Sequence, residues 1–214
     1  MRPLERLICA ASDPHQRGIL TLGGPVPADA RKAAVLVLLT QTPEPVVTLI
    51  ERASTLRKHA GQIAFPGGAV DPGDESVVAA ALRETEEEIG LPPREVRVFG
   101  TLPEAWVPVS GYGVTPVLGA WDGRYPIRPV RPEEVSAVLR LPVTRLSDPQ
   151  VRACSVHSSG HTGPAFVLDH LFIWGFTAHL LSWVLELGGW ARPWDDTRLL
   201  DVPERFQRDR KPTT

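Results

Sequence analysis

Runs of apolar residues along the chain predict a series of strands around an amphipathic helix. The first run, residues 33–39, is continuous and made of Ala, Val and Leu, which is typical of a buried strand. After a short helix or turn from Pro132, a further strand is expected to end at Leu141. Other strands or extended segments are predicted at residues 46–50, 63–65, 96–99 and 113–118.

A helix is predicted between clear start and stop signals. Asp74 follows the turn-forming Asp71-Pro72-Gly73 and is the expected N-cap, whereas Gly90 is expected to end the helix. Its sheet-facing stripe is predicted to consist of Val78, Leu82, Thr85 and Ile89.

The remaining pattern predicts the domain organisation. Residues 147–165 read as a polar loop and residues 171–187 as a second helix. Because strands, turns and helices alternate without a regular βαβ cadence, we expect an α/β fold with a mixed sheet and helices on both faces. One domain is predicted at residues 31–190. Before it, residues 1–30 form an extension that packs loosely or forms a short leading helix, and after it residues 191–214 form a polar, partly disordered tail.

Composition is that of a soluble globular protein. The 214 residues are 43% hydrophobic and 22% charged, with a net charge of −2, which gives no electrostatic sign of a nucleic-acid or membrane partner. No apolar run approaches the roughly 18 residues that a membrane span needs. Two distant cysteines, Cys9 and Cys154, fit a reducing compartment, and the N-terminus lacks the apolar region of a signal peptide. We therefore expect a cytoplasmic protein.

An acidic face on the predicted helix carries the candidate chemistry. Glu84, Glu87 and Glu88 are related by i, i+3 and i+4, so they share one sector, expected roughly opposite the apolar stripe. Like charges at this spacing repel, more strongly in a partly desolvated site, and a divalent cation such as Mg²⁺ would offset that repulsion. Acidic runs are most often solvated surface, but no lysine lies between Ile63 and Leu91 to compensate this one.

The acidic run follows a glycine turn, and together they resemble the Nudix box. Gly67 and Gly68 allow close backbone approach to a ligand, although a glycine pair alone predicts only a tight turn. The chain departs from the usual box in two places. Asp74 replaces the usual Glu and is followed by a spacer one residue longer than usual, and Thr85 replaces an aliphatic residue. The matching residues are Gly68, Arg83, Glu84, Glu87, Glu88, Gly90 and Leu91.

The first departure resembles the coenzyme A pyrophosphatase subgroup of that family. The subgroup also has an upstream signature, which this chain matches at every spacing. The signature residues are Arg52-Ala53, Arg57, Gly61 and Phe65-Pro66-Gly67-Gly68. The core resemblance runs from about residue 33 to residue 187.

This resemblance implies a Nudix-like α/β/α sandwich and a metal-dependent hydrolase. The implied reaction splits the pyrophosphate bond of coenzyme A, or of its derivatives, to 4′-phosphopantetheine and adenosine 3′,5′-bisphosphate, with Mg²⁺ or Mn²⁺ as cofactor. Arg83 would orient a carboxylate of the helix. The metal ligands would be Glu84, Glu87 and Glu88.

Further residues are candidates for substrate contacts and for the general base. Arg52 and Arg57 carry guanidinium groups that match phosphate geometry, and Gly67 and Gly68 would shape the loop under the diphosphate. Spacing does not choose the base, and the candidates are Glu87, Glu104, Glu133 and Glu134.

Two other functions stay open at this point. One is the same chemistry on another nucleoside diphosphate derivative, such as ADP-ribose or a dinucleotide. The other is a Nudix-fold binding module without catalysis, against which the intact acidic face argues. Cys154, His157 and His161 have near-zinc spacing but lack a close fourth ligand, so we expect no zinc there. Since many Nudix relatives are homodimers, a dimer is expected.

Overall fold

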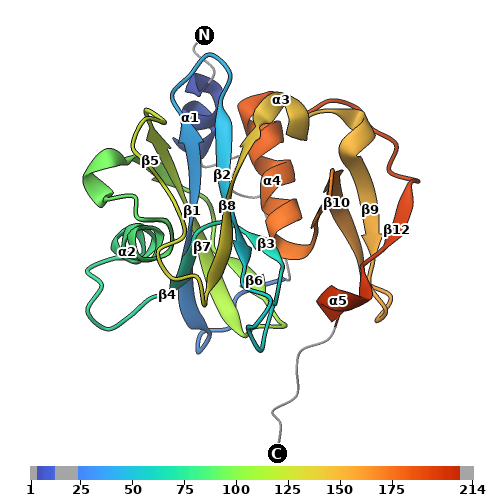
Figure 1. The fold of residues 1–214 in the computed structure, drawn as a ribbon, viewed down its shortest axis with the longest axis horizontal. Helices are drawn as coiled ribbons and strands as arrows, with labels where there is room; N and C mark the ends of the chain where they lie inside the picture. The colour runs from blue at the N-terminus through green and yellow to red at the C-terminus, as the bar shows by residue number, and fades with distance from the viewer. Residues whose placement is uncertain (1–3, 13–23, 208–214) are drawn as a thin grey trace, which may run out of the picture.

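The computed structural model describes residues 4–12 and 24–207, which form a mixed sheet with helices on both faces (Figure 1). Strand β1 (Arg31–Thr40) lies in its middle, parallel to β7 (Tyr112–Trp121) and antiparallel to β2 (Val46–Arg52) and β4 (Gly67–Ala69). The predicted mixed α/β architecture is confirmed. The other strands of this sheet are β3 (Ile63–Ala64), β5 (Arg97–Thr101), β6 (Ala105–Val107) and β8 (Val135–Pro142).

Alternate side chains of β1 divide the core between the two faces, because successive residues of a strand point in opposite directions. Leu36 and Leu38 pack with Ala80, Ala81 and other residues of α2 (Val77–Ile89) in one cluster. Val37 and Leu39 pack on the opposite face with α4 (Gly175–Gly188). The continuous apolar run that predicted a buried strand is therefore buried on both faces.

A second sheet lies beyond α4, in the order β11-β10-β9-β12 (Figure 1). Residues of β10 and β11 share the α4 core cluster, so this helix packs between the two sheets. Short helical elements complete the described part: α3 (Val143–Leu146), α5 (Glu204–Gln207) and 3₁₀ turns at Pro93–Glu95 and Pro149–Val151. The strands are β9 (Arg152–Val156), β10 (Thr162–Leu168), β11 (Leu171–Ile173) and β12 (Leu199–Asp201).

This second sheet corrects three sequence predictions. Residues 147–165 are not a polar loop, because β9 and most of β10 lie within them. The predicted helix at 171–187 begins instead at Gly175, after strand β11. In the predicted tail, β12 pairs in parallel with β9, so residues 199–207 belong to the fold. Residues 208–214 lie outside the described part.

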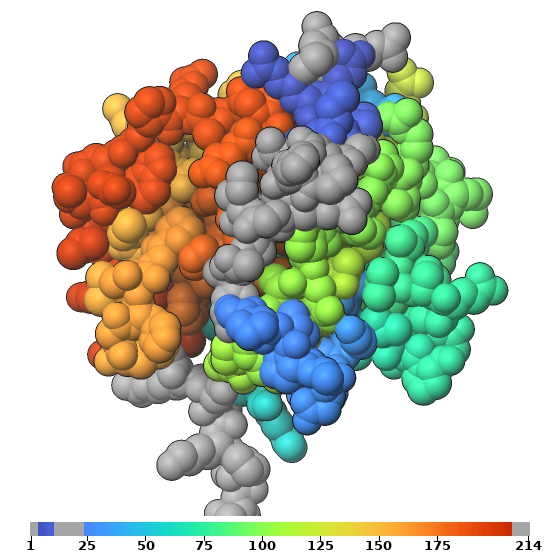
Figure 2. All heavy atoms as spheres, turned by 180° about the vertical axis from the view of Figure 1, so that it is seen from behind, coloured from blue at the N-terminus to red at the C-terminus, as the bar shows by residue number. Residues whose placement is uncertain are grey.

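The N-terminal segment contains a short helix, α1 (Glu5–Ser12). Leu7 of this helix and Leu4 just before it are buried in the α4 core cluster. The view from behind shows the dark-blue α1 beside the orange α4 (Figure 2). Part of the predicted 1–30 extension is thus a packed leading helix, and residues 13–23 lie outside the described part. Within the described residues, no helix is long and apolar enough to cross a membrane.

Candidate active site

Helix α2 begins two residues later than predicted. Its N-cap is Ser76, whose hydroxyl accepts a 3.1 Å hydrogen bond from the Ala79 N–H. The predicted cap, Asp74, instead accepts the Asp71 N–H and binds Arg83. Gly90 ends the helix with φ at 73°, as predicted.

Arg83 fastens this helix to the end of β4. Its Nε and Nη2 donate to the two carboxylate oxygens of Asp74, at 2.9 Å and 3.0 Å. Nη2 also donates to the carbonyl oxygen of Ala69 at 3.1 Å. The hydrogen bond from Arg83 lowers the pKa of Asp74, and the same bond raises the pKa of Arg83. The acidic residue that departs from the usual box therefore holds the arginine in place.

The glycine turn brings the backbone directly against the acidic helix. Gly67 has φ at 147°, and a Cβ there would collide with the backbone of Ala34 and Val35. A Cβ on Gly68 would lie 2.5 Å from Cδ of Glu84. At Gly67 the neighbouring strand and the positive φ require glycine, whereas at Gly68 a side chain would have to displace the Glu84 carboxylate.

Glu88 is buried, with 3% of its surface exposed. Its Oε2 accepts a 3.0 Å hydrogen bond from the Gly67 N–H. Burial raises the pKa of Glu88 to about 8, and the charge of Glu84 adds to this, while the Gly67 N–H and the charge of Arg52 act in the opposite direction. The prediction that all three glutamates lie opposite the sheet-facing stripe is wrong for Glu88, because the glycine turn covers it.

The other two carboxylates of the face are partly exposed and bound to arginines. Glu84 accepts from Arg83 Nη1 at 3.0 Å, and burial raises its pKa. Glu87 accepts from the same Nη1 at 3.4 Å through Oε1. Its Oε2 forms a 2.7 Å ion pair with Nη2 of Arg131, a residue that the sequence analysis did not single out.

The donor set fits a hard divalent cation. Among the described residues, no three His, Cys, Asp or Glu side chains are already gathered as a metal cage. However, Glu84 and Glu88 are both desolvated and repel each other, and the absence of a side chain at Gly68 leaves room for the Glu84 carboxylate. Carboxylate oxygens in this setting are the ligands that Mg²⁺ and Mn²⁺ prefer, and a cation would relieve the repulsion.

Only one of the two signature arginines reaches this face. Arg52 lies near enough to Glu88 for its charge to lower that pKa, and its buried Nε has no hydrogen-bond partner among the described residues. Arg57 is exposed on the hairpin between β2 and β3, and no contact between it and the three carboxylates is seen in the described part of the chain. Because this Nε is itself enclosed, Arg52 would act on a phosphate through its charge and its terminal nitrogens.

The structure separates the candidates for the general base. In the described part of the chain, Glu104 forms its ion pair with Lys32 at 3.0 Å and not with a residue of the acidic face, and Glu133 is exposed. Glu134 is close enough to Glu88 for its charge to raise that pKa, and it pairs with Arg131 at 3.7 Å. Glu134 and Glu87 are therefore the two candidates at the acidic face.

The near-zinc motif lies in the second sheet. His157 stacks on Trp174 with ring centroids 5.7 Å apart, and its Nδ1 is 2.7 Å from the Ser159 hydroxyl. Burial raises the pKa of Cys154, which disfavours the thiolate that zinc binds.

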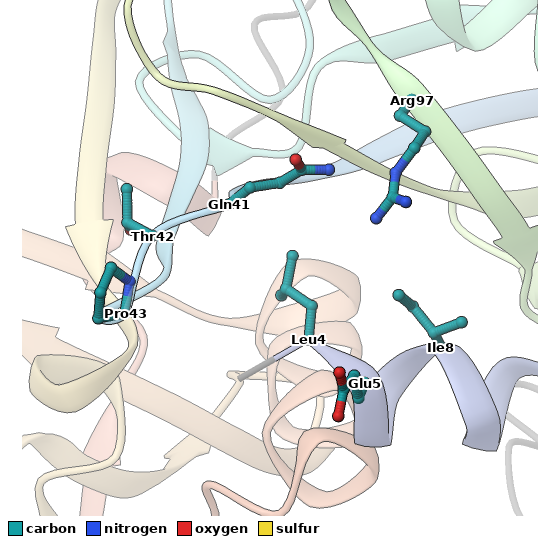
Figure 3. A pocket seen from close by; sticks show the side chains of 7 residues that line it. All are labelled: Leu4, Glu5, Ile8, Gln41, Thr42, Pro43 and Arg97. Atoms are coloured by element: carbon teal, nitrogen blue, oxygen red, sulfur yellow. The ribbon is translucent and has the colours of Figure 1, made fainter. Parts of the chain in front are cut away.

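Two of the cavities in the described structure lie near ends of strands β1 and β2. The larger, about 580 Å³, lies between α1 and the turn after β1, and is lined by Leu4, Ile8, Gln41 and Arg97 among others (Figure 3). It is at the opposite end of β1 from Ala34, which pairs with Gly68. The other, about 500 Å³, is bounded by the β2–β3 hairpin, β11 and α5. Of these two cavities, the second shares the β2–β3 hairpin with the candidate site.

Comparison with known proteins gives one consistent family. The chain is 44% identical over 162 residues to uncharacterized Nudix hydrolase NudL of Salmonella paratyphi B, and equally to that of Salmonella newport, covering 74% of this chain and 83% of each relative. Among solved structures, the Nudix hydrolase RenU of M. Smegmatis is 25% identical with a TM-score of 0.47, covering 56% of this chain and 74% of that one. The NUDIX domain of Shewanella oneidensis NrtR, complexed with ADP ribose, is 20% identical with a TM-score of 0.44, covering 66% and 85%.

The family described as NUDIX domain matches residues 30–156. This match spans more than half of the 214 residues and contains both the glycine turn and the acidic helix. The chain therefore belongs to the Nudix family of hydrolases.

Proposed function

We propose that this protein hydrolyses the pyrophosphate bond of coenzyme A or of a coenzyme A derivative. Water is consumed, and the products are 4′-phosphopantetheine and adenosine 3′,5′-bisphosphate. The main support for coenzyme A as the substrate is the position of the signature hairpin beside Glu88. The hairpin starts at Arg52, whose charge acts on Glu88, and ends at the glycine turn, which donates a hydrogen bond to Glu88. Signature and acidic helix therefore form one site.

Glu84, Glu87 and Glu88 are the proposed ligands of Mg²⁺ or Mn²⁺. When bound, the metal would offset the negative charge of the diphosphate and lower the pKa of an attacking water. Asp74 fixes the guanidinium group of Arg83, and Arg83 in turn orients Glu84 and Glu87 by hydrogen bonds. Arg52 and Arg57 are the proposed phosphate contacts. Because Gly67 and Gly68 have no side chains, the backbone of this turn could approach the diphosphate closely.

The cavity of about 500 Å³ is the proposed place for the pantetheine arm. Its size is within the usual range for ligand pockets. Apolar walls come from Ile63, Leu171, Phe172 and Phe206, and polar groups come from Glu51, Ser54, His170 and Arg205. Such a lining suits an uncharged chain that contains amides.

Product analysis tests this proposal. Purified protein with Mn²⁺ is incubated with coenzyme A, ADP-ribose or a dinucleoside polyphosphate at equal concentration, and the products are separated by chromatography. We expect coenzyme A to be cleaved fastest, with adenosine 3′,5′-bisphosphate as the adenine product. Faster cleavage of ADP-ribose or the dinucleotide would assign the same chemistry to a different substrate. No cleavage of any of them would contradict the catalytic proposal.

Location and assembly belong to the same proposal. We expect the enzyme to act in the cytoplasm, where coenzyme A would be available to it, and to form a homodimer. Light scattering during size-exclusion chromatography would measure the mass, and a monomer would contradict the second expectation.

A further inference from the structure

Among the described residues outside α2, Arg131 makes the shortest ion pair with the acidic face. Its Nη2 lies 2.7 Å from Oε2 of Glu87, compared with 3.4 Å between Arg83 Nη1 and Oε1 of the same carboxylate. Both oxygens of Glu87 thus interact with arginines. The charge of Glu87 is the main reason that the pKa of Arg131 is raised.

The backbone around Arg131 is fixed to the end of α2. The Arg128 N–H donates to the Ile89 carbonyl oxygen at 3.1 Å, and the Val130 N–H donates to that of Glu88 at 3.0 Å. These two bonds use carbonyl oxygens at the C-terminal end of the helix, which have no partner within it. They hold the segment against the acidic face, so the ion pair does not depend on a free surface loop.

A second acidic partner lies on the other side of Arg131. Glu134 is 3.7 Å from Nη1, and its carbonyl oxygen accepts the N–H of Ala53, the residue after Arg52. Arg131 therefore lies between the acidic helix and the start of the signature hairpin. With 41% of its side chain exposed, its guanidinium group is accessible to a ligand.

We infer that Arg131 is the built-in counter-ion of Glu87 and a further phosphate-binding residue of this site. A guanidinium and a divalent cation compete for the same carboxylate, because each satisfies its negative charge. Once Glu87 serves as a metal ligand, Arg131 keeps its ion pair with Glu134, and its guanidinium group can bind a phosphate oxygen of the substrate. This inference rests on the metal-ligand role proposed above for Glu87.

The two roles make opposite predictions for one variant. In Arg131→Ala, Mn²⁺ should bind more tightly because its competitor is gone, by about two- to fivefold, the range expected for one exposed ion pair. At saturating Mn²⁺, kcat/KM for coenzyme A should nevertheless fall by at least about tenfold, because a charge-assisted phosphate contact is lost. Arg131→Lys should restore the competition with Mn²⁺ but only part of the catalytic efficiency.

Arg128→Ala is the matched control, since this exposed arginine lies three residues away and its removal changes the net charge equally. Mn²⁺ affinity is measured by electron paramagnetic resonance of free Mn²⁺, without substrate, and kcat/KM by product formation. A parallel fall of both quantities in Arg131→Ala, or values equal to those of Arg128→Ala, would overturn the inference. If the wild type cleaves no coenzyme A while the Mn²⁺ difference persists, the proposed substrate fails and the counter-ion role of Arg131 stands.

Discussion

The N–H of Gly67 donates a 3.0 Å hydrogen bond to Oε2 of Glu88, and this bond joins the glycine turn to the acidic helix. It lies over a buried carboxylate on a helix face that the sequence predicts to lie opposite the apolar stripe. A desolvated carboxylate beside a second one is costly without a positive partner. The hydrogen bond from Gly67 therefore holds Glu88 in a buried position where a bound cation would stabilise its negative charge.

Replacing Gly68 should impair catalysis far more than folding. In Gly68→Ala the new Cβ would lie 2.5 Å from Cδ of Glu84 and would displace that carboxylate. A displacement of about 1 Å at a catalytic group can cost about a hundredfold in rate, so we expect a loss in kcat of that order.

Gly73→Ala provides the comparison, because a Cβ at Gly73 meets nothing within 4 Å. Initial rates and thermal unfolding are measured on both variants. Equal kcat values for Gly68→Ala and Gly73→Ala would show that Glu84 does not need its present position.

Burial of Glu88 predicts a pH dependence of stability in the protein stripped of divalent ions. The folded state raises the pKa of Glu88 from 4.5 to about 8. Its contribution to stability is therefore fully present below about pH 4.5 and is lost as the pH rises through about 8. In EDTA, the melting temperature of the wild type relative to Glu88→Gln should fall by roughly 10 °C between pH 5 and pH 9.

Differential scanning fluorimetry across that pH range gives the measurement. The glutamine has nearly the same volume and no charge, so groups that titrate elsewhere cancel in the difference. Parallel pH profiles for the two proteins would show that Glu88 does not titrate differently on folding.

Filling the hairpin cavity should weaken substrate binding without changing the chemical step. Ala60 lines this cavity, so in Ala60→Phe the ring would occupy space proposed for the pantetheine arm. We expect KM for coenzyme A to rise several-fold, and kcat to stay within about twofold, because ground-state contacts are lost away from the reacting phosphorus.

Thr55→Phe adds the same ring at an exposed position of the same hairpin, outside the cavity lining. Steady-state kinetics on both variants separate cavity filling from a general effect on the loop. An unchanged KM in Ala60→Phe would place the arm elsewhere.

Local patterns in the sequence predicted the elements around the site better than the remainder of the fold. The strands β1, β2 and β7 and the helix α2 have strong periodicity or long apolar runs, and they were predicted within a few residues. Strand β9 contains Arg152, which packs its guanidinium between the rings of Phe166 and Trp194. A buried arginine does not look like a strand core in sequence, so the second sheet was missed.

At the site itself, sequence spacing identified the acidic positions but not their surroundings. Helical periodicity puts Glu88 in one sector with Glu84, yet only the tertiary contact with Gly67 shows that Glu88 is buried. Asp74 and Ser76 are both good caps, and the competing bond from Arg83 decided between them. Arg131 gave no signal, because its partner Glu87 lies 44 residues earlier in the chain.

Direct Mn²⁺ binding tests most sharply whether the acidic face of α2 is a metal site. Equilibrium dialysis compares the wild type with the double variant Glu84→Gln/Glu88→Gln and with Glu86→Gln, an exposed residue of the same helix. We predict that the double variant loses Mn²⁺ binding and coenzyme A cleavage together, that Glu86→Gln retains both, and that excess EDTA abolishes wild-type cleavage. Undiminished Mn²⁺ binding by the double variant, or full cleavage in EDTA, would contradict the account.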